Sequence, residues 1–270
     1  MVYTGYLALE VGKKRERSFI SSSFFDGVFK ITRPTYLVED LPLLTMIHVG
    51  GGYIDGDTYR TEITMKNRAK LALTTQASTK VYKSMEKGVS QENEFHLGEK
   101  CELYLKQDPL ILYKNARFMQ DTTVHLTDSS VFYFTDIISP GWSPDGLPFQ
   151  YERLQSKMKI YVNESLQIID HLLLEPSKKI DGIMQLEGYS HIGSLIYIHE
   201  KIEEKMIQEL YELLIRKKKI RVGISLLPIK GLTIRVLASN SYEIEGAFNE
   251  VESFIFQHLY DKEPIHWRKS

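Results

Sequence analysis

The sequence has little cysteine and no long apolar segment. Cys101 is the single cysteine among 270 residues, so no disulfide can form within the chain, and a reducing compartment is expected. No apolar run is long enough to cross a bilayer, and the first residues lack the apolar segment of a secretory signal. We therefore expect a cytoplasmic protein that does not act at a membrane.

An excess of either charge is also absent. The 34 basic and 35 acidic side chains nearly cancel, whereas nucleic-acid-binding proteins usually carry a basic surface that neutralises phosphates. The eight histidines are scattered along the chain and form no histidine-rich tail for metal storage. We expect neither a nucleic-acid partner nor a metal-storage role.

A glycine-rich stretch, GGGYIDGDTY at residues 50–59, raises the question of phosphate or metal binding. A P-loop requires a lysine after its last glycine, but no lysine occurs before Lys66, and Asp55 occupies the third glycine position of a dinucleotide fingerprint. The stretch also lies between two predicted strands, whereas both phosphate motifs precede a helix. The sequence therefore excludes a nucleotide-binding loop here.

Enzyme motifs are similarly missing. His199, Glu200 and Glu203 at the expected start of a helix resemble half of a zinc motif, but a glutamate replaces the second histidine. No nucleophile elbow occurs. Asp55 and Asp57 would share a face if a strand began at Asp55, yet a turn in which carboxylates accept backbone N–H groups is favoured. We expect no enzyme; a metal-dependent hydrolase using Asp55, Asp57 and a distant histidine is the alternative.

The first part of the chain has the alternating pattern of β-strands. Short segments rich in β-branched and aromatic residues follow one another with turn residues between them. They include DGVFKITRP, TYRTEITM, AKLALTT, CELYLK, TVHLTD and SVFYFTDII. We predict a mainly β protein whose body, residues 1–190, consists of sandwiched or stacked sheets.

Residues 191–270 change in character and predict a small α/β part packed on this body. GSLIYI is a strand candidate, and a helical stripe then runs from Ile198 to Leu214. KIRVGISLL and GLTIRVLAS predict a hairpin, and a second helix follows with Asn240 as its N-cap. Two helices would thus cover a sheet that contains the hairpin.

A strand-like segment, LTTQASTKVYKS at residues 73–84, is unusually rich in hydroxyl groups. Either a solvated sheet face or the wall of a buried polar channel would explain it, because buried hydroxyls need hydrogen-bond partners.

These residues resemble the urease accessory protein UreD family, called UreH in some organisms. TTQASTKVYKS, residues 74–84, is similar to its signature block nearly letter for letter, and GGYIDGD, residues 51–57, resembles a Gly-Gly-x-x-Gly-Gly-Asp segment in which Asp55 replaces a glycine. Arg33-Pro34, the segment around Asp136 and the segment from Phe149 resemble further blocks. The matching motif residues are Gly51, Gly52, Gly56, Gln76, Lys80 and Tyr82.

The resemblance implies a scaffold without catalytic activity. Proteins of this family bind apo-urease and a second accessory protein, UreF, which recruits the GTPase UreG, and the assembly delivers nickel to the urease active site. No tightly bound cofactor is implied, only nickel in transit.

The resemblance also implies an internal nickel passage. Its expected carboxylates here are Asp57, Asp136 and Asp170, and its expected hydroxyl wall is Thr74, Thr75 and Ser78. Each residue also has a local alternative: Asp57 would cap a turn, the hydroxyls would bond neighbouring strands, and Asp136 and Asp170 would pair with a lysine. A β-rich binding module of another pathway is a further alternative for the whole chain.

Overall fold

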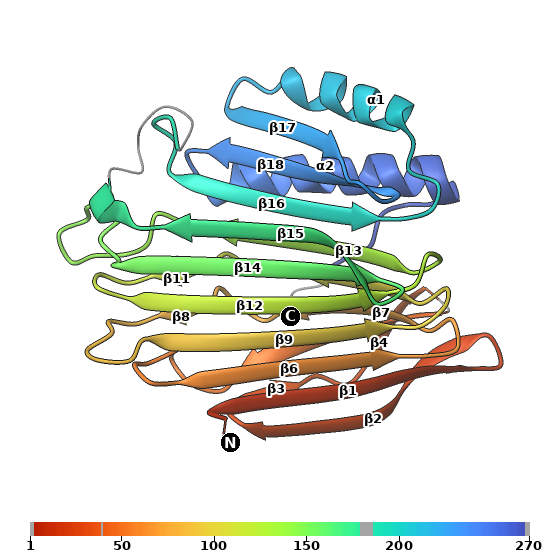
Figure 1. Ribbon diagram of the computed structural model, residues 1–270, viewed down its shortest axis with the longest axis horizontal. Coiled ribbons are helices and arrows are strands. Elements are labelled where there is room, and N and C mark those ends of the chain that lie inside the picture. The colour runs from red at the N-terminus through yellow and green to blue at the C-terminus, as the bar shows by residue number, and fades with distance from the viewer. Residues whose placement is uncertain (1–2, 39, 179–185, 268–270) are drawn as a thin grey trace.

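The computed structural model describes residues 3–38, 40–178 and 186–267, and it is mainly β (Figure 1). The strands are β1 Gly5–Lys14, β2 Arg17–Gly27, β3 Phe29–Ile31, β4 Thr35–Val38, β5 Leu41–His48, β6 Thr58–Met65, β7 Lys70–Thr75, β8 Lys80–Val81, β9 Val89–Leu97, β10 Glu102–Lys106, β11 Ile111–Leu112, β12 Arg117–Leu126, β13 Val131–Ile138, β14 Arg153–Val162, β15 Ser165–Leu174, β16 His191–Ile198, β17 Ile220–Leu226 and β18 Gly231–Ala238. The helices are η1 Pro176–Lys178, α1 Glu204–Ile215 and α2 Ser241–Tyr260.

Two large sheets form the body. A seven-stranded sheet has the order β15-β14-β12-β9-β6-β1-β2, and a nine-stranded sheet contains the path β17-β18-β16-β13-β10-β7-β5-β3, with β4 paired to β5. From β6 to β14 the long strands alternate between the two sheets, so the neighbours within each sheet run parallel. The predicted stacked-sheet, mainly β fold is confirmed.

The pattern of apolar residues explains the two layers. In β6 and β9 every second side chain is buried, as expected for strands with one face against a core. These side chains meet those of the nine-stranded sheet in one large apolar cluster, which includes Leu7, Phe95 and Phe132. The opposite face of the nine-stranded sheet is covered by α1 and α2, whose apolar stripes form a second cluster with Tyr133 and Leu195.

The C-terminal elements extend the nine-stranded sheet. β16 pairs antiparallel with β13 and with β18, and β17 and β18 form the predicted hairpin. Asn240 caps α2 as predicted, because its side chain accepts a 3.0 Å hydrogen bond from the Glu243 N–H. The division of the chain into a β-rich body that ends at residue 190 and an α/β part that begins at residue 191 stays a prediction.

The predicted start of the first helix is wrong. Ile198 ends β16, and α1 begins only at Glu204 with Glu203 as its N-cap. His199 therefore lies in the connection between them, where its Nδ1 accepts a hydrogen bond from the Lys201 N–H at 3.0 Å. The prediction was wrong because the apolar residues at the end of the buried strand and in the following turn happen to continue the spacing of the helix.

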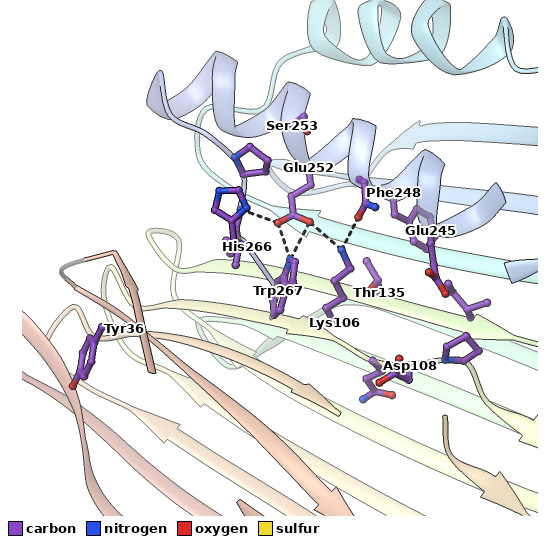
Figure 2. Close-up of a pocket in the computed structure, with 16 residues that line it drawn as sticks. Tyr36, Lys106, Asp108, Thr135, Glu245, Phe248, Glu252, Ser253, His266 and Trp267 are labelled. Atoms are coloured by element: carbon purple, nitrogen blue, oxygen red, sulfur yellow. Dashed lines mark hydrogen bonds and ion pairs between the residues drawn. The ribbon is translucent and has the colours of Figure 1, made fainter. Parts of the chain in front are cut away.

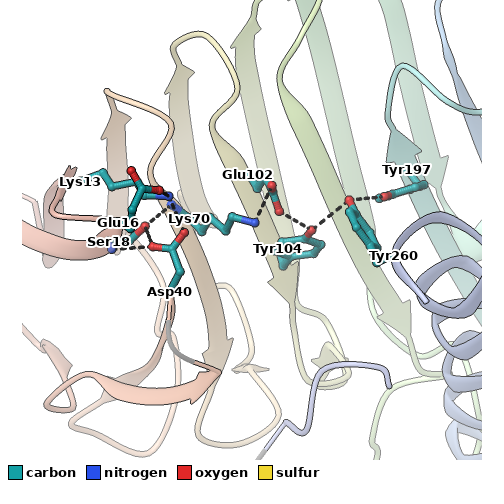
Figure 3. A network of polar contacts seen from close by, with 9 residues as sticks. All are labelled: Lys13, Glu16, Ser18, Asp40, Lys70, Glu102, Tyr104, Tyr197 and Tyr260. Carbon is teal, nitrogen blue, oxygen red and sulfur yellow. Dashed lines mark hydrogen bonds and ion pairs between the residues drawn. The ribbon is translucent and has the colours of Figure 1, made fainter. Parts of the chain in front are cut away.

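A polar network crosses the helix-covered face of the nine-stranded sheet (Figure 3). Lys70 forms an ion pair with Glu102 at 2.8 Å, and Tyr104 donates to the same carboxylate at 2.8 Å. The Tyr260 hydroxyl at the end of α2 lies 3.5 Å from that of Tyr104 and 3.2 Å from that of Tyr197. The network joins the C-terminal helix to strands of the body.

The helices of the described residues include no segment that is both long and apolar enough to span a bilayer.

Candidate functional site

The glycine-rich turn between β5 and β6 is held against the hydroxyl-rich segment. Tyr53 and residues 80–82 exchange backbone hydrogen bonds: the Tyr53 N–H donates to the Lys80 carbonyl at 2.7 Å, and the Tyr82 N–H donates to the Tyr53 carbonyl at 2.8 Å. The Tyr82 hydroxyl donates to the Gly51 carbonyl at 2.8 Å. The two segments that carry the family resemblance therefore form one unit.

Glycine is required at position 52 of this unit. Gly52 has a φ of +139°, and a Cβ there would lie 2.6 Å from the Lys80 carbonyl oxygen, a distance that forces the backbone apart. Gly56 has a φ of +86°, which also favours glycine, and its N–H donates to the Gly88 carbonyl at 2.8 Å. The glycines serve close backbone approach rather than phosphate binding.

Asp55 has a local structural role. Its carboxylate accepts hydrogen bonds from three successive backbone N–H groups, those of Glu86, Lys87 and Gly88, at 2.9, 3.1 and 2.6 Å. These donors hold the pKa of Asp55 below its ordinary value. Asp55 thus fixes the 86–88 turn, whereas the Asp57 carboxylate binds a different set of groups.

Asp57 is also engaged by neighbouring groups. One oxygen accepts from the Ile54 N–H at 2.8 Å and from the Tyr59 hydroxyl at 2.6 Å, and the other accepts from the Thr4 hydroxyl at 3.1 Å. The Tyr59 hydroxyl lies 3.4 Å from Nε2 of His48. Burial and the bond to Asp57 raise the pKa of Tyr59, so this tyrosine stays a neutral link between the aspartate and the histidine.

Beside the turn lies a cavity of about 220 Å³. His48 and the glycines of the turn form one side, and the segment from Thr75 to Lys80, which includes Gln76 and Ser78, forms the other. His48 was not predicted as a site residue, because it ends β5 and precedes the recognisable motif.

A second, narrow cavity of about 20 Å³ continues from the first between the two sheets. The two share four lining residues: Met46, Tyr53, Thr75 and Thr79. Its volume suits about one water molecule or one small ion. Asp136 on β13 lines it, only 9% exposed, and burial raises the pKa of Asp136 to about 6, although the nearby Arg235 opposes the shift.

Thr75 and Asp108 connect this narrow cavity to the other side of the nine-stranded sheet. The Thr75 hydroxyl donates to the Asp108 carboxylate at 2.9 Å and accepts from the Asp108 N–H at 2.8 Å. Gln107 and Asp108 directly follow β10, and both line the narrow cavity and a third cavity. The row of cavities therefore turns around the end of this strand.

The third cavity, of about 700 Å³, lies between α2, the C-terminal segment and the end of β10 (Figure 2). Lys106 reaches Asn249 at 2.7 Å and Glu252 at 3.4 Å. The indole N–H of Trp267 donates to Glu252 at 2.8 Å. Burial raises the pKa of Glu252, and the lysine and the indole stabilise its charged form.

Comparison with known proteins gives the family. The family model of the UreD urease accessory protein matches residues 3–269. A urease accessory protein UreD of Bacillus sp. (strain TB-90) is 43% identical over 270 residues, which covers 100% of both chains. A urease accessory protein UreD of Lachnoclostridium phytofermentans is 39% identical, and the match covers 97% of both chains. One of Staphylococcus aureus (strain bovine RF122 / ET3-1) is 37% identical, and the match covers 99% of this chain and 98% of the relative.

The chain belongs to the UreD family. Its resemblance to this family, based on residues 51–57 and 74–84, is confirmed.

The three predicted carboxylates of this UreD-family chain lie in separate places. Asp136 lines the narrow cavity. Asp57 instead lines a separate depression of about 390 Å³, together with Arg117 and Arg153. It is linked to the first cavity through Tyr59, whose hydroxyl lies between Asp57 and His48. Asp170 on β15 forms a two-oxygen ion pair with Arg235 of the facing sheet. Its partner is thus an arginine rather than the expected lysine.

The predicted hydroxyl wall is also divided. Thr75 and Ser78 line the first cavity. Thr74 lies on the opposite face of β7, because successive strand residues alternate, and its hydroxyl donates to the Lys106 carbonyl at 2.7 Å. Thr74 is therefore not brought together with Thr75, whereas Thr79, Asp108 and Gln120, which were not predicted, line the narrow cavity.

Proposed function

We propose that this chain is a non-catalytic scaffold for urease maturation. In this proposal it binds the urease apoprotein and UreF, contacts the GTPase UreG through UreF, and lets nickel pass through its interior toward the urease active site. It holds no cofactor tightly. Family membership along nearly the whole chain supports the accessory role, and the row of three cavities supports a route for the metal.

The chemistry of the narrow cavity carries the nickel part of the proposal. Its polar lining offers carboxylate, hydroxyl and amide oxygens from Asp136, Thr79 and Gln120. A borderline metal ion can move between stations that offer few ligands, whereas a closed set of four strong ligands would retain it. An aspartate with a pKa of about 6 also exchanges a proton for a cation easily near neutral pH.

The alternatives receive less support. A metal-dependent hydrolase was predicted to use Asp55 and Asp57, but the Asp55 carboxylate is occupied by three backbone amides, and the two carboxylates serve different turns. A β-rich binding module of another pathway would leave the family match without a reason.

The first test is reconstitution of urease with Asp136→Asn. This near-isosteric change removes the negative charge at the narrowest point and keeps the shape of the side chain. We expect the variant to co-purify with UreF and urease as the unchanged chain does, while the nickel content of the urease falls at least several-fold.

Asp121→Asn is the matched control, because Asp121 lies on the outward face of β12, away from the cavities. Equal nickel content for Asp136→Asn and the unchanged chain would reject the metal route. Failure of the unchanged chain to bind urease or UreF would reject the scaffold role itself.

A further inference from the structure

The outward face of the seven-stranded sheet carries a second group of metal-ligating side chains, remote from the row of cavities. Glu94 and His96 lie two residues apart on β9 and so share a face. His125 on β12 is the direct cross-strand neighbour of His96. One ligand atom from each of the three residues lies within 4.8 Å of the others.

The two imidazoles are held in place by stacking. The His96 and His125 ring centroids are 4.4 Å apart with an interplanar angle of 6°, and Tyr161 of β14 stacks on the other side of His125 at 5.1 Å. A carboxylate oxygen of Glu94 lies 3.0 Å from Nε2 of His96. This arrangement keeps the two imidazoles side by side on the sheet face, and both rings must rotate before their nitrogen atoms can bind the same ion.

His125 also has a buried nitrogen that lacks a hydrogen bond. Its Nδ1 is enclosed and has no hydrogen-bond partner among the described residues, and the nearest carboxylate oxygen recorded for it, from the exposed Glu164, is 4.0 Å away. A buried polar atom without a partner is uncommon and costs free energy. One ring nitrogen of a cluster member therefore has no polar partner within the described part of the chain.

The surrounding charges favour a cation. Arg60 contacts three carboxylates, those of Glu62, Glu92 and Glu94, at 2.5 to 2.8 Å. One guanidinium therefore faces three negative charges, and the excess negative potential attracts divalent cations. The second oxygen of Glu94 remains directed at His96.

We propose that Glu94, His96 and His125 bind a divalent transition-metal ion of the borderline class, such as nickel or zinc. Imidazole and carboxylate are the ligands that suit such ions. Because donor atoms around a metal with bonds of about 2.1 Å must approach to roughly 3 Å, the histidine and glutamate side chains close around the ion by rotation. Three protein ligands leave positions for water, so the ion exchanges with solvent.

The test is equilibrium dialysis of the untagged, chelator-treated chain against Ni²⁺. We expect the unchanged chain to retain about one more nickel ion than His96→Ala does. Glu94→Gln should bind this ion more weakly than the unchanged chain. Because Glu94 is proposed as a direct ligand, the loss of affinity should exceed the ~10- to 100-fold that follows loss of an outer-shell partner. His96 is exposed, so its replacement leaves the core intact.

His171→Ala is the matched control, because His171 is an exposed histidine on β15 of the same sheet, outside the cluster. It should bind nickel as the unchanged chain does. Equal retention by His96→Ala and the unchanged chain, or an equal loss in His171→Ala, would overturn the proposal. A visible Co²⁺ spectrum that His96→Ala abolishes would independently support direct nitrogen ligation.

Discussion

Asp136 lies in an environment unlike that of an ordinary surface carboxylate, because it is buried between the sheets. Its pKa is raised from 3.8 to about 6 by burial, so the folded state binds a proton more tightly than the unfolded chain does. The free energy of unfolding must then decrease as the pH rises from about 4 to about 6, and the penalty remains at higher pH. A buried charge at this position is a cost that a purely structural role would not require.

Asp136→Asn should therefore stabilise the chain in a pH-dependent way. The variant cannot ionise at this position, so it should match the unchanged chain near pH 4 and exceed it above pH 6. At about 1.4 kcal/mol per pKa unit, the gain is up to ~3 kcal/mol. Urea unfolding of both chains at several pH values measures it, and a difference that does not vary with pH would contradict the raised pKa.

For individual residues, the sequence predicted only some of the roles that the structure shows. The glycine requirement and the local role of Asp57 followed from residue types, because turn chemistry is local. That Asp55 accepts backbone N–H groups was also expected, but its three donors were not, since they lie about thirty residues away in a turn that only the fold brings near. The pairing of His96 with His125 was invisible for the same reason.

Among the elements, α2 is the one whose stability bears most directly on the proposed route, because it covers the largest of the three cavities that form it. Its N-terminus is capped by the Asn240 side chain, whereas the N-cap of α1, Glu203, makes no side-chain cap hydrogen bond. The strands were predicted because their alternation is local. The parallel pairing from β6 to β14 was not, because each of these strands pairs with one that lies two long strands further along the chain.

Asn240→Ala should destabilise the chain by ~1 kcal/mol, as loss of a side-chain N-cap does. Glu203→Ala is the matched control and should have a much smaller effect, since no cap bond is lost. Chemical unfolding monitored by circular dichroism compares them. Equal effects of the two substitutions would show that the Asn240 cap does not hold α2.

In the whole molecule, the three cavities form the proposed nickel route, which runs from the space between the two sheets to the helix-covered side of the nine-stranded sheet. The first lies beside the glycine turn, the second between the sheets, and the third under α2 on the far side of the nine-stranded sheet. The strand order explains this course, because the loop after β10 carries Gln107 and Asp108 from one layer to the other. The outward Glu94, His96 and His125 cluster lies off this route.

Thr79 is a position from which the route can be closed without touching a carboxylate, since it is one of the residues that line both the first and the narrow cavity. Thr79→Leu should fill the space of about 20 Å³ and lower the nickel content of reconstituted urease at least several-fold, while co-purification with UreF and urease persists. Thr79→Val keeps the branched shape and removes only the hydroxyl, so it should lower the nickel content of urease much less than Thr79→Leu does. Loss of loading in both variants would point to the hydroxyl as a ligand. Full loading with Thr79→Leu would exclude the narrow cavity as the path of the metal and leave the scaffold role to be judged by the binding assay alone.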